Sequence, residues 1–504
     1  MEFRLKSRWI LSLILLGLAL ATVPAPAQSA GTFTATGDMT AARASHTATL
    51  LQDGKVLIVG GDETGTAELY DPATGTFTPT GNMSTGHGGN AATLLPDGRV
   101  LIVGGSKSEL YDPSTGIFSA TGNMVEVQTG FTATLLRNGK VLITGGTNGG
   151  SDCCAIAANP ELYDPSTGAF NLAGSYIKTG ATSVGQDSAG TSGLAYAAAT
   201  LLPDGKVLIL SEPAAELYDP GTNTFSLTGS MVAVDENNYW GKPTQIDGRT
   251  ATLLTNGKVL VAGGNPAYFD TGDFPLSRAE LYDTSSGTFM ATGSMHLTRQ
   301  FQSATLLPDG TVLITGGGFD NYFTAIAFAE LYTPSTGTFF GMINQRAGRE
   351  FQQATLLNDG RVLITGGLSS AGYPRTQKFA SAEIYTPPVI VPAPVLLSLS
   401  SDGKGQGAIQ HAGTYRIASP EDPAAAGEYL SIYLTGLADG SMIPPLVAIG
   451  GRLAEVTFWG GVPGYPGLDI VNVRMPSGVA SGPAVPVRLT YLGRSSNQVT
   501  IGGQ

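Results

Sequence analysis

The fold of this chain is decided by the stretch ATLLQDGKVLIVGG, residues 48–61. Residues 48–51 are expected to form a strand, and the Gln-Asp-Gly-Lys segment a tight turn in which Gly54 takes a positive φ without steric cost. A second strand is expected over 56–59. Because the apolar residues of this second strand are consecutive rather than alternating, we expect both of its faces to be buried.

The same phrase occurs seven times along the chain. Its copies begin at Ala48, Ala92, Ala133, Ala199, Ala251, Ala304 and Ala354. Each is followed by a Glu-(Leu/Ile)-Tyr phrase centred on Tyr70, Tyr111, Tyr163, Tyr218, Tyr282, Tyr332 and Tyr385. In the first copy we expect a third strand over 67–70 and a more polar fourth strand over 76–80. Four antiparallel strands with buried central members are typical of a propeller blade packed between two neighbours.

The two ends of the repeat array predict how the ring closes. The seventh unit lacks a Thr-Gly-x-Phe phrase and runs from Tyr385 into Pro387 and Pro388, whereas residues 31–39 match the fourth strands of the first two units. We therefore expect the N-terminal segment to complete blade seven, which removes the edges that an open array would expose.

Residues 31–387 resemble the kelch family. Six units carry the paired glycines of that family, and the Tyr and the Asp-Pro turn follow them. The fourth unit departs from the pattern with Ser211 and Glu212 in place of the glycines, and Phe replaces the outer-strand Trp common in kelch blades. The resemblance implies an all-β, seven-bladed kelch β-propeller.

A second unit is expected after the propeller. We assign residues 28–387 to the propeller, 388–394 to a Pro-rich linker that favours an extended chain, and 395–504 to a C-terminal domain. Strand-like runs in this domain predict an antiparallel, immunoglobulin-like β-sandwich. They span 429–434, 446–449, 454–458, 470–475, 485–491 and 499–501. The segments 467–474 and 496–501 resemble an uncharacterised domain of large secreted bacterial proteins, which implies no chemistry.

The N-terminus and the composition predict where the protein acts. Residues 1–27 have the charged start, apolar middle and Ala-x-Ala end of a secretory signal, so we expect a secreted protein, extracellular or periplasmic. No later run reaches the roughly 20 apolar residues of a membrane span, so no transmembrane anchoring is expected. A formal net charge of −12 argues against nucleic acid as a partner. The adjacent Cys153 and Cys154 are a disulfide candidate, and we expect a monomer.

Loop length distinguishes the two faces of the predicted ring. The turns between strands one and two, and between strands three and four, are uniform. The loops on the opposite face vary and contain long inserts at 147–159, 175–196, 232–248, 265–278, 318–328 and 368–381. Binding groups tend to lie on elaborated loops held by a rigid scaffold, so this loop-rich face is the candidate site. The alternative is that the inserts are idle surface insertions.

Candidate ligand-binding residues recur at two positions counted back from the Ala that begins each ATLL phrase, namely position −5 and position −2. They are Arg43, His46, His87, Asn90, Gln128, Phe131, Arg249, Arg299, Gln302, Arg349 and Gln352, and Trp240 in an insert joins them. Such planar donors and aromatic groups suit sugar hydroxyls, carboxylates or acidic peptide segments. For the arginines at position −5, the alternative is that they bind loop carbonyls or bridge adjacent blades.

Seven kelch blades followed by a β-sandwich also resemble galactose oxidase and related copper radical oxidases. The resemblance implies a copper site of two His and two Tyr, with one Tyr cross-linked to Cys. This chain has only His46, His87, His296 and His411, and it lacks the family's Tyr-His pair. We therefore predict no catalytic residue, metal or cofactor, and a function in binding an extracellular glycan or protein. A copper radical oxidase is the alternative, and calcium bound by insert carboxylates is a weaker one.

Overall fold

The computed structural model describes residues 30–504, except 63, 85–90, 105–106, 149–155, 178–197, 211–213, 232–245, 267–274, 320–323, 370–376 and 439. The predicted signal segment 1–27 lies outside the described residues. The described part of the chain consists of strands, turns and loops and contains no helix. Within it, no segment therefore forms the long apolar helix that a membrane crossing requires.

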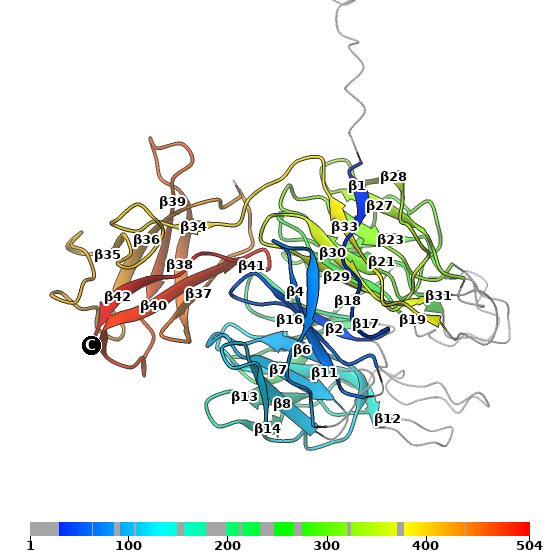
Figure 1. The fold of residues 1–504 in the computed structure, drawn as a ribbon, viewed down its shortest axis with the longest axis horizontal. Coiled ribbons are helices and arrows are strands. Elements are labelled where there is room, and N and C mark those ends of the chain that lie inside the picture. Colours follow the sequence, from blue (N-terminus) through cyan, green and yellow to red (C-terminus); the bar gives the residue numbers. More distant parts are fainter. Residues whose placement is uncertain are drawn as a thin grey trace, which may run out of the picture.

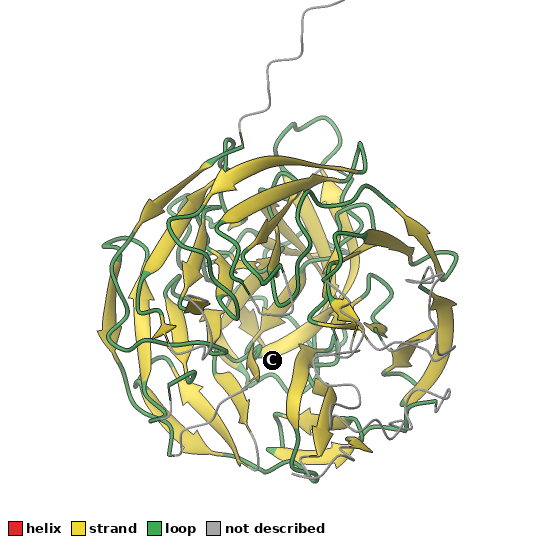
Figure 2. Cartoon of the chain, turned by 90° about the vertical axis from the view of Figure 1, so that its right-hand side faces the viewer, coloured by secondary structure: helices red, strands yellow, loops and turns green. Residues whose placement is uncertain are grey.

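Seven four-stranded antiparallel sheets form a ring, which confirms the predicted propeller (Figures 1 and 2). The innermost strands contact one another in order around the axis and are β2 (Thr47–Leu50), β6 (Ala91–Leu94), β10 (Thr129–Leu135), β15 (Ala199–Leu201), β20 (Thr250–Leu253), β25 (Ser303–Leu306) and β29 (Gln353–Leu356). The second strands are β3 (Val56–Val59), β7 (Val100–Gly104), β11 (Val141–Asn148), β16 (Val207–Ile209), β21 (Val259–Ala262), β26 (Val312–Thr315) and β30 (Val362–Thr365).

The two outer positions of each blade complete the sheets. The third strands are β4 (Ala67–Asp71), β8 (Lys107–Asp112), β13 (Glu161–Asp164), β17 (Ala214–Asp219), β23 (Ala279–Asp283), β27 (Phe328–Thr333) and β33 (Ala382–Thr386). The outermost strands are β5 (Thr76–Pro79), β9 (Ile117–Ala120), β14 (Ala169–Leu172), β18 (Thr224–Ser230), β24 (Thr288–Ala291), β28 (Thr338–Asn344) and β1 (Thr32–Ala35). Strand β1 pairs antiparallel with β33, from Thr32 opposite Thr386 to Ala35 opposite Glu383, so the N-terminal segment supplies the outer strand of blade seven.

The core of the propeller lies between the blades. All four residues of β3 are buried, as their consecutive apolar side chains require, because neighbouring blades cover both faces of the strand. One apolar cluster, for example, joins Ile58 of blade one to Leu363 and Ile384 of blade seven. The same arrangement recurs around the ring, so each blade depends on its neighbours for burial of its apolar surface.

A Thr-Gly clasp fastens successive blades near the rim. Thr80, which directly follows the outer strand β5 of blade one, shares a 2.9 Å hydrogen bond with the Tyr111 hydroxyl of blade two. The next residue, Gly81, donates its N–H to the Gly116 carbonyl of that blade. The same Thr–Tyr bond joins Thr36 to Tyr70, Thr121 to Tyr163, Thr228 to Tyr282 and Thr292 to Tyr332. The clasp explains why the repeat needs both the Tyr and the Thr-Gly pair.

Blade four lacks this clasp. Ala173 stands at the position that Thr holds in or directly after five other outer strands, so Tyr218 bonds instead to Asn223 of its own blade, at 2.9 Å. Burial, together with the charge of Asp219, raises the pKa of Tyr218 to about 12. Blade seven departs as well, because no Thr follows Phe340 in the outer strand of blade six, and Tyr385 donates to the Ala30 carbonyl at 2.9 Å.

The C-terminal domain is all-β, and its strands form one nine-stranded sheet that curls round a single core. In sheet order the main path runs β34 (Val395–Leu396), β36 (Tyr429–Thr435), β39 (Asp469–Arg474), β38 (Arg452–Gly461), β37 (Leu446–Ile449), β40 (Gly482–Tyr491) and β41 (Arg494–Ser495). Two further strands flank it, β35 (Ile409–His411) on β36 and β42 (Val499–Gly503) on β40. The long strand β38 pairs with β39 on one side and with β37 on the other, and so joins the two parts of the sheet. The immunoglobulin-like class of the predicted sandwich stays a prediction.

The C-terminal domain docks on the uniform turns of the propeller (Figure 1). Arg488 donates to the Gln52 carbonyl at 2.9 Å, and the Met442 N–H donates to the Thr255 carbonyl at 2.7 Å. Asn358 contributes both its side chain and its carbonyl, which accept N–H groups of Ser495 and Ala393. Gln52, Thr255 and Asn358 all open turns between a first and a second strand, so this face is occupied and the loop-rich face is left free of the domain.

The Thr-Gly clasp generates a stability prediction. A Cβ at Gly122 would lie 2.2 Å from the Gly168 carbonyl oxygen, which is backbone and cannot move alone. We expect Gly122→Ala to lower the free energy of unfolding by about 1–3 kcal/mol, the usual range for overpacking. A Cβ at Gly413 meets no atom within 4 Å, so Gly413→Ala is the matched control. Equal urea midpoints for the two variants would contradict the clasp.

Candidate functional site

The loop-rich face lies opposite the C-terminal domain. Short extra strands mark its inserts (Figure 1), namely β12 (Ile156–Ala157) on β11, the pair β19 (Ile246–Asp247) and β22 (Asn265–Pro266), and the pair β31 (Leu368–Ser369) and β32 (Gln377–Lys378). The first strands of all blades begin on this face, next to the axis. In the blades where the structure describes them, positions −5, −3 and −2 therefore lie at the mouth of the propeller.

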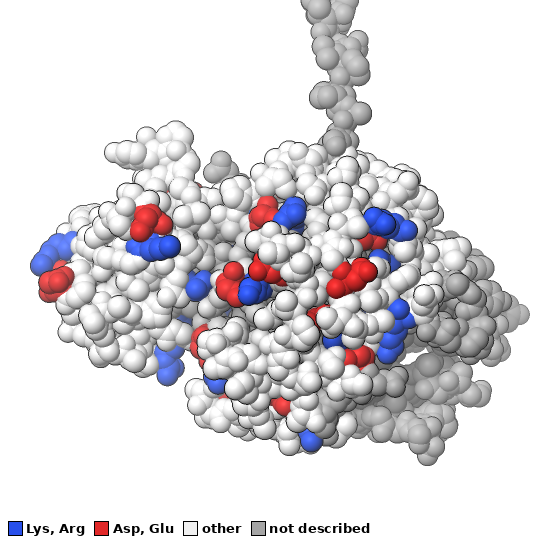
Figure 3. Space-filling view, in the orientation of Figure 1, with Lys and Arg blue, Asp and Glu red and all other residues white. Residues whose placement is uncertain are grey.

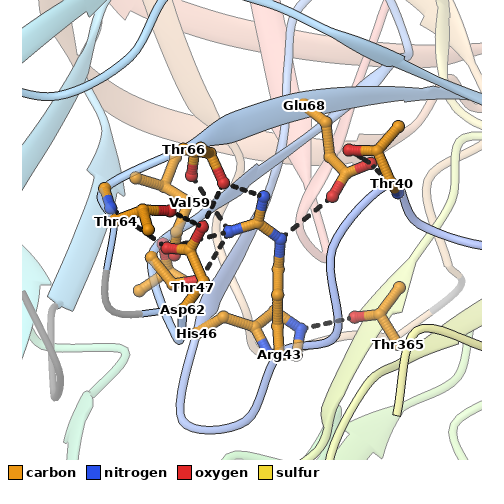
Figure 4. A network of polar contacts seen from close by, with 12 residues as sticks. Thr40, Arg43, His46, Thr47, Val59, Asp62, Thr64, Thr66, Glu68 and Thr365 are labelled. Atoms are coloured by element: carbon orange, nitrogen blue, oxygen red, sulfur yellow. Dashed lines mark hydrogen bonds and ion pairs between the residues drawn. The ribbon is translucent and has the colours of Figure 1, made fainter. Parts of the chain in front are cut away.

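At position −5, Arg43 is fully buried in a network of its own blade (Figure 4). Its Nε donates to Glu68 at 2.9 Å, and its Nη1 donates to the carbonyls of Gly60 at 2.7 Å and Thr66 at 3.0 Å. Asp62 lies 3.4 Å from the same guanidinium. Gly60 and Thr66 are the two ends of the loop between strands two and three, so this side chain clamps the loop.

Arg299 and Arg349 repeat the clamp in blades six and seven. Arg299 binds Glu330 at 2.9 Å and the carbonyls of Gly316 and Phe328. Arg349 binds Glu383 at 3.2 Å and the carbonyls of Gly366 and Ser381, and its guanidinium lies 4.6 Å from the Phe379 ring centre. Both side chains are buried.

For the three arginines, these contacts agree with the alternative that they bind loop carbonyls. Their guanidiniums bind loop carbonyls and buried carboxylates, so the geometry supports a role in holding the loops. In blade three the clamp is weaker, because the amide nitrogen of the buried Gln128 reaches the Asn159 carbonyl at 3.4 Å and Glu161 at 3.5 Å.

At position −2, side chains are wedged between blades. Gln352 packs where a Cβ of Gly316 would stand, and its Nε2 donates to Thr315 at 3.0 Å. Gln302 packs in the same way on Gly263 and donates to the Ala262 carbonyl at 2.8 Å. The next blade therefore fills the side-chain space of the first glycine in these pairs, while the second glycine, such as Gly317, packs against the position −2 residue of its own blade.

His46 is the position −2 wedge of blade one. Its Cε1 packs on Gly366 of blade seven, and its Nε2 lies 2.8 Å from the Thr365 hydroxyl (Figure 4). Burial, and to a lesser degree the charge of Arg43, lowers the pKa of His46 to about 3, so the ring is neutral at physiological pH.

The other predicted site residues lie in different surroundings. Phe131 is buried in the cluster between blades two and three, and the half-buried Arg249 directs Nη1 to the Met231 sulfur. The predicted residues His87, Asn90, Trp240, Cys153 and Cys154 lie outside the described residues. Among the members of the predicted ligand-binding set that the structure describes, most side chains are buried in packing contacts between or within blades.

The exposed part of the mouth is position −3, which the sequence reasoning missed. Phe301 and Phe351 are partly exposed there, with their ring centres 4.6 Å apart. Both have left-handed backbones, with φ of 53° and 55°, as does the exposed Ser45 at 53°. Gly130 and Gly248 hold the same position in other blades. This mixture of Gly with Ser and Phe was the available sequence signal, because it marks a position that needs a positive φ.

Backbone hydrogen bonds hold the position −3 residues to one another. The Phe301 N–H donates to the Gly248 carbonyl, and the Ser45 N–H donates to the Phe351 carbonyl, both at 3.0 Å. The Phe301 ring also fills the space that a Cβ at Gly248 would need. The two aromatic rings are therefore fixed against blades five and one on either side.

The described histidines do not fit a copper site. His46 is neutral and wedged between blades, and His296 directs Nδ1 to Glu330 at 2.8 Å. His411 lies in the C-terminal domain, where its ring nitrogens bond to Glu428 at 2.5 Å and to the Asp422 carbonyl at 3.0 Å. Among the residues that the structure places, no group of three or more His, Cys, Asp or Glu side chains could hold a metal ion.

Of three comparisons with known proteins, the comparison with solved structures gives a match. No protein-family model matches the chain, and no curated protein sequence does. Among solved structures, the chain is similar to a fungal alcohol oxidase of the AA5 family in complex with copper, with a TM-score of 0.59 and 17% identity over 95% of this chain and 99% of that one. At this identity the likeness concerns the fold alone, and it confirms the predicted galactose-oxidase-like kelch propeller.

The position −5 clamp generates a prediction that separates packing from ligand binding. Arg299→Met leaves Glu330 buried without its partner, and losing one member of a buried pair costs about 3–5 kcal/mol of unfolding free energy. We expect Arg299→Met combined with Glu330→Gln to recover part of that loss in urea unfolding. Unchanged stability of Arg299→Met would contradict the clamp and return Arg299 to the ligand-binding candidates.

Blade four generates a pH prediction. Burial raises the pKa of Glu216 from its ordinary value of 4.5 to about 7, although the Ile177 N–H at 3.1 Å opposes the shift. Since the folded protein then holds this proton more tightly than the unfolded chain, the unfolding free energy should fall as pH rises between these two values. Glu216→Gln should flatten this decline and stabilise the protein at pH 8.

Glu330 is the matched control for that experiment. Burial alone would raise its pKa, but hydrogen bonds from the His296 N–H and from Arg299 outweigh burial and lower the pKa. The contribution of Glu330 to the unfolding free energy is therefore lost as the pH falls, whereas that of Glu216 is lost as the pH rises. Identical pH profiles of unfolding free energy for Glu216→Gln and the wild-type protein would contradict the assignment.

Proposed function

We propose that this protein is an exported binding protein that recognises an extracellular glycan or protein through the loop-rich face of its propeller. The observation that supports the proposal is the pair Phe301 and Phe351 at the mouth, whose rings contact each other at a tilt of 30°, are partly exposed and stand on left-handed backbone.

The backbone of the pair argues against a packing role. A non-glycine residue with a positive φ costs roughly 1–3 kcal/mol, and such residues cluster at ligand clamps and active sites. Glycine occupies the equivalent position in blades three and five without this cost. Two phenylalanines retained there at a cost in stability fit a surface that is selected for contact with a ligand.

The surroundings of the pair favour a preorganised surface. Arg299 and Arg349 clamp the loops of the same two blades, and Arg43 clamps the next one. A rigid aromatic surface loses little conformational entropy on binding, which raises affinity for a given contact area. Partly exposed aromatic rings suit the apolar faces of sugar rings and equally the aromatic or aliphatic side chains of a protein segment.

A copper radical oxidase remains the second candidate, because the fold is shared with a copper-bound alcohol oxidase along nearly the whole chain. A fold does not carry a function without its site, and the described histidines are engaged elsewhere. Metal analysis and a peroxide assay with primary alcohols and sugars after copper loading separate the two candidates. Stoichiometric copper with peroxide release would overturn the binding proposal.

The binding proposal is tested by the double variant Phe301→Gly and Phe351→Gly. It removes both rings and relieves the strained φ, so the gain from the relieved backbone offsets part of the ring packing that is lost. On glycan and peptide arrays we expect the full-length wild-type protein to bind, and the double variant to lose at least tenfold in affinity. Leu172→Ala, at an exposed apolar residue on β14, is the control. Array binding that survives the double variant would refute the role of the mouth.

A further inference from the structure

We infer that the protein has a second binding site, a groove between the propeller and the C-terminal domain that continues along the outer face of the curled sheet and takes a neutral oligosaccharide chain. It lies on the side of the propeller opposite the mouth and does not rest on the function proposed above. It begins in a cleft of about 770 Å³.

Both domains build this cleft. The propeller contributes turns of blades two and three, including Asp97, Lys140 and Asp164, and the C-terminal domain contributes the β37–β38 turn with Arg452 and the neighbouring Arg474. A volume of this size is within the range of about 300–1,000 Å³ that small-molecule sites occupy. The lining is largely polar side chains and turn backbone, which offers hydrogen-bond partners rather than an apolar pocket.

The charges of the cleft balance one another. Lys140 pairs with Asp164 at 3.1 Å, and Arg474 lies 3.9 Å from Glu455. Asp97 pairs with Arg99 at 2.7 Å. Figure 3 likewise shows acidic and basic groups interspersed over the visible face, without a large area of one sign. A polyanion or a polycation needs a field of one sign, so the charge complementarity of the cleft favours a neutral ligand.

The cleft continues into a row of side chains on the outer face of the curled sheet. Arg474 and Glu455 of the cleft are in register with Tyr429, so the three side chains form one row across β36, β39 and β38. The next row contains Ser431, Asn472 and Phe458.

These rows face away from the core. The Ser431 hydroxyl donates to the Asn472 side-chain oxygen at 2.9 Å, which places both on one face. The intervening Leu430 and Val473 belong to the core on the other side. Tyr429 is 51% exposed and Phe458 49% exposed. A bulge between Val456 and Phe458 turns Phe458 outward, next to this polar row.

The chemistry of this strip matches a sugar chain better than a protein partner. Two exposed aromatic side chains stand in successive rows, on the strands β36 and β38 that flank β39. With a row spacing of about 7 Å and two strand spacings of about 4.8 Å, their backbone positions are about 12 Å apart. Between and beside them lie the side chains of Asn472, Arg474 and Glu455, whereas Ser431 is buried and its hydroxyl donates to Asn472. Sugar rings present apolar faces to aromatic side chains and hydroxyls that both donate and accept, whereas the core of a protein interface is continuous, apolar and poor in charges.

The test uses the full-length protein and titration calorimetry with neutral hexasaccharides, namely cellohexaose, xylohexaose and mannohexaose. We expect at least one to bind, and Tyr429→Ala and Phe458→Ala each to weaken that binding tenfold or more without changing thermal stability. Leu399→Ala, at an exposed residue between β34 and β35, is the matched control and should bind normally.

Contrasting probes and the mouth variant make the outcome decisive. Polygalacturonate and chitosan carry charge and should bind more weakly than the neutral chains. The double variant Phe301→Gly and Phe351→Gly should bind the hexasaccharide as the wild-type protein does. The inference is overturned if no neutral hexasaccharide binds, if a charged polymer binds more tightly, or if binding survives both strip variants and disappears in the mouth variant.

Discussion

The rest of the propeller depends on one buried carboxylate per blade, the Glu of the third strand. Glu68, Glu161 and Glu330 accept backbone N–H groups of Thr40, Val125 and His296, which lie on the loop that arrives from the preceding blade. Two residues later on the same strand, and so on the same face, the Tyr hydroxyl holds the outer strand of that preceding blade. An ionised carboxylate is costly to bury unless it is paired and hydrogen-bonded, so no blade is satisfied without its neighbour.

This constraint determines which mouth positions are free to vary. The Glu requires a donor such as the Arg at position −5, and the glycine pairs require the wedge at position −2. The only requirement at position −3 is a positive φ. Gly adopts it freely, whereas Ser45, Phe301 and Phe351 adopt it at a cost in conformational free energy. Recurrence within the repeat therefore identified packing residues, while position −3, where the residue type varies, carries the aromatic pair on which the proposed binding function rests.

The sequence contained the blades, their strand order and the two-domain layout, because each follows from local periodicity and turn chemistry. The predicted strands of the C-terminal domain also match the structure, for example 429–434 against β36 and 446–449 against β37. The site could not be found in this way, since the role of Arg299 depends on residues about 17 to 31 positions further along its own blade, and that of Gln352 on a contact between blades. The groove could not be predicted from the sequence either, because Lys140 and Arg474 are brought together only by the docking of two domains.

The clamped sector of the ring coincides with its seam. Strand β1 is held in blade seven by pairing with β33, where Ala35 stands opposite Glu383, and Glu383 is the residue that Arg349 binds. Arg43 lies just beyond β1 and pairs with Glu68 on the other side of the seam. A ring closed by a single short strand would open first there, so buried ion pairs on both sides stabilise the weakest junction. The Phe301 and Phe351 platform stands on this same sector, which makes closure of the ring and rigidity of the mouth two results of one network.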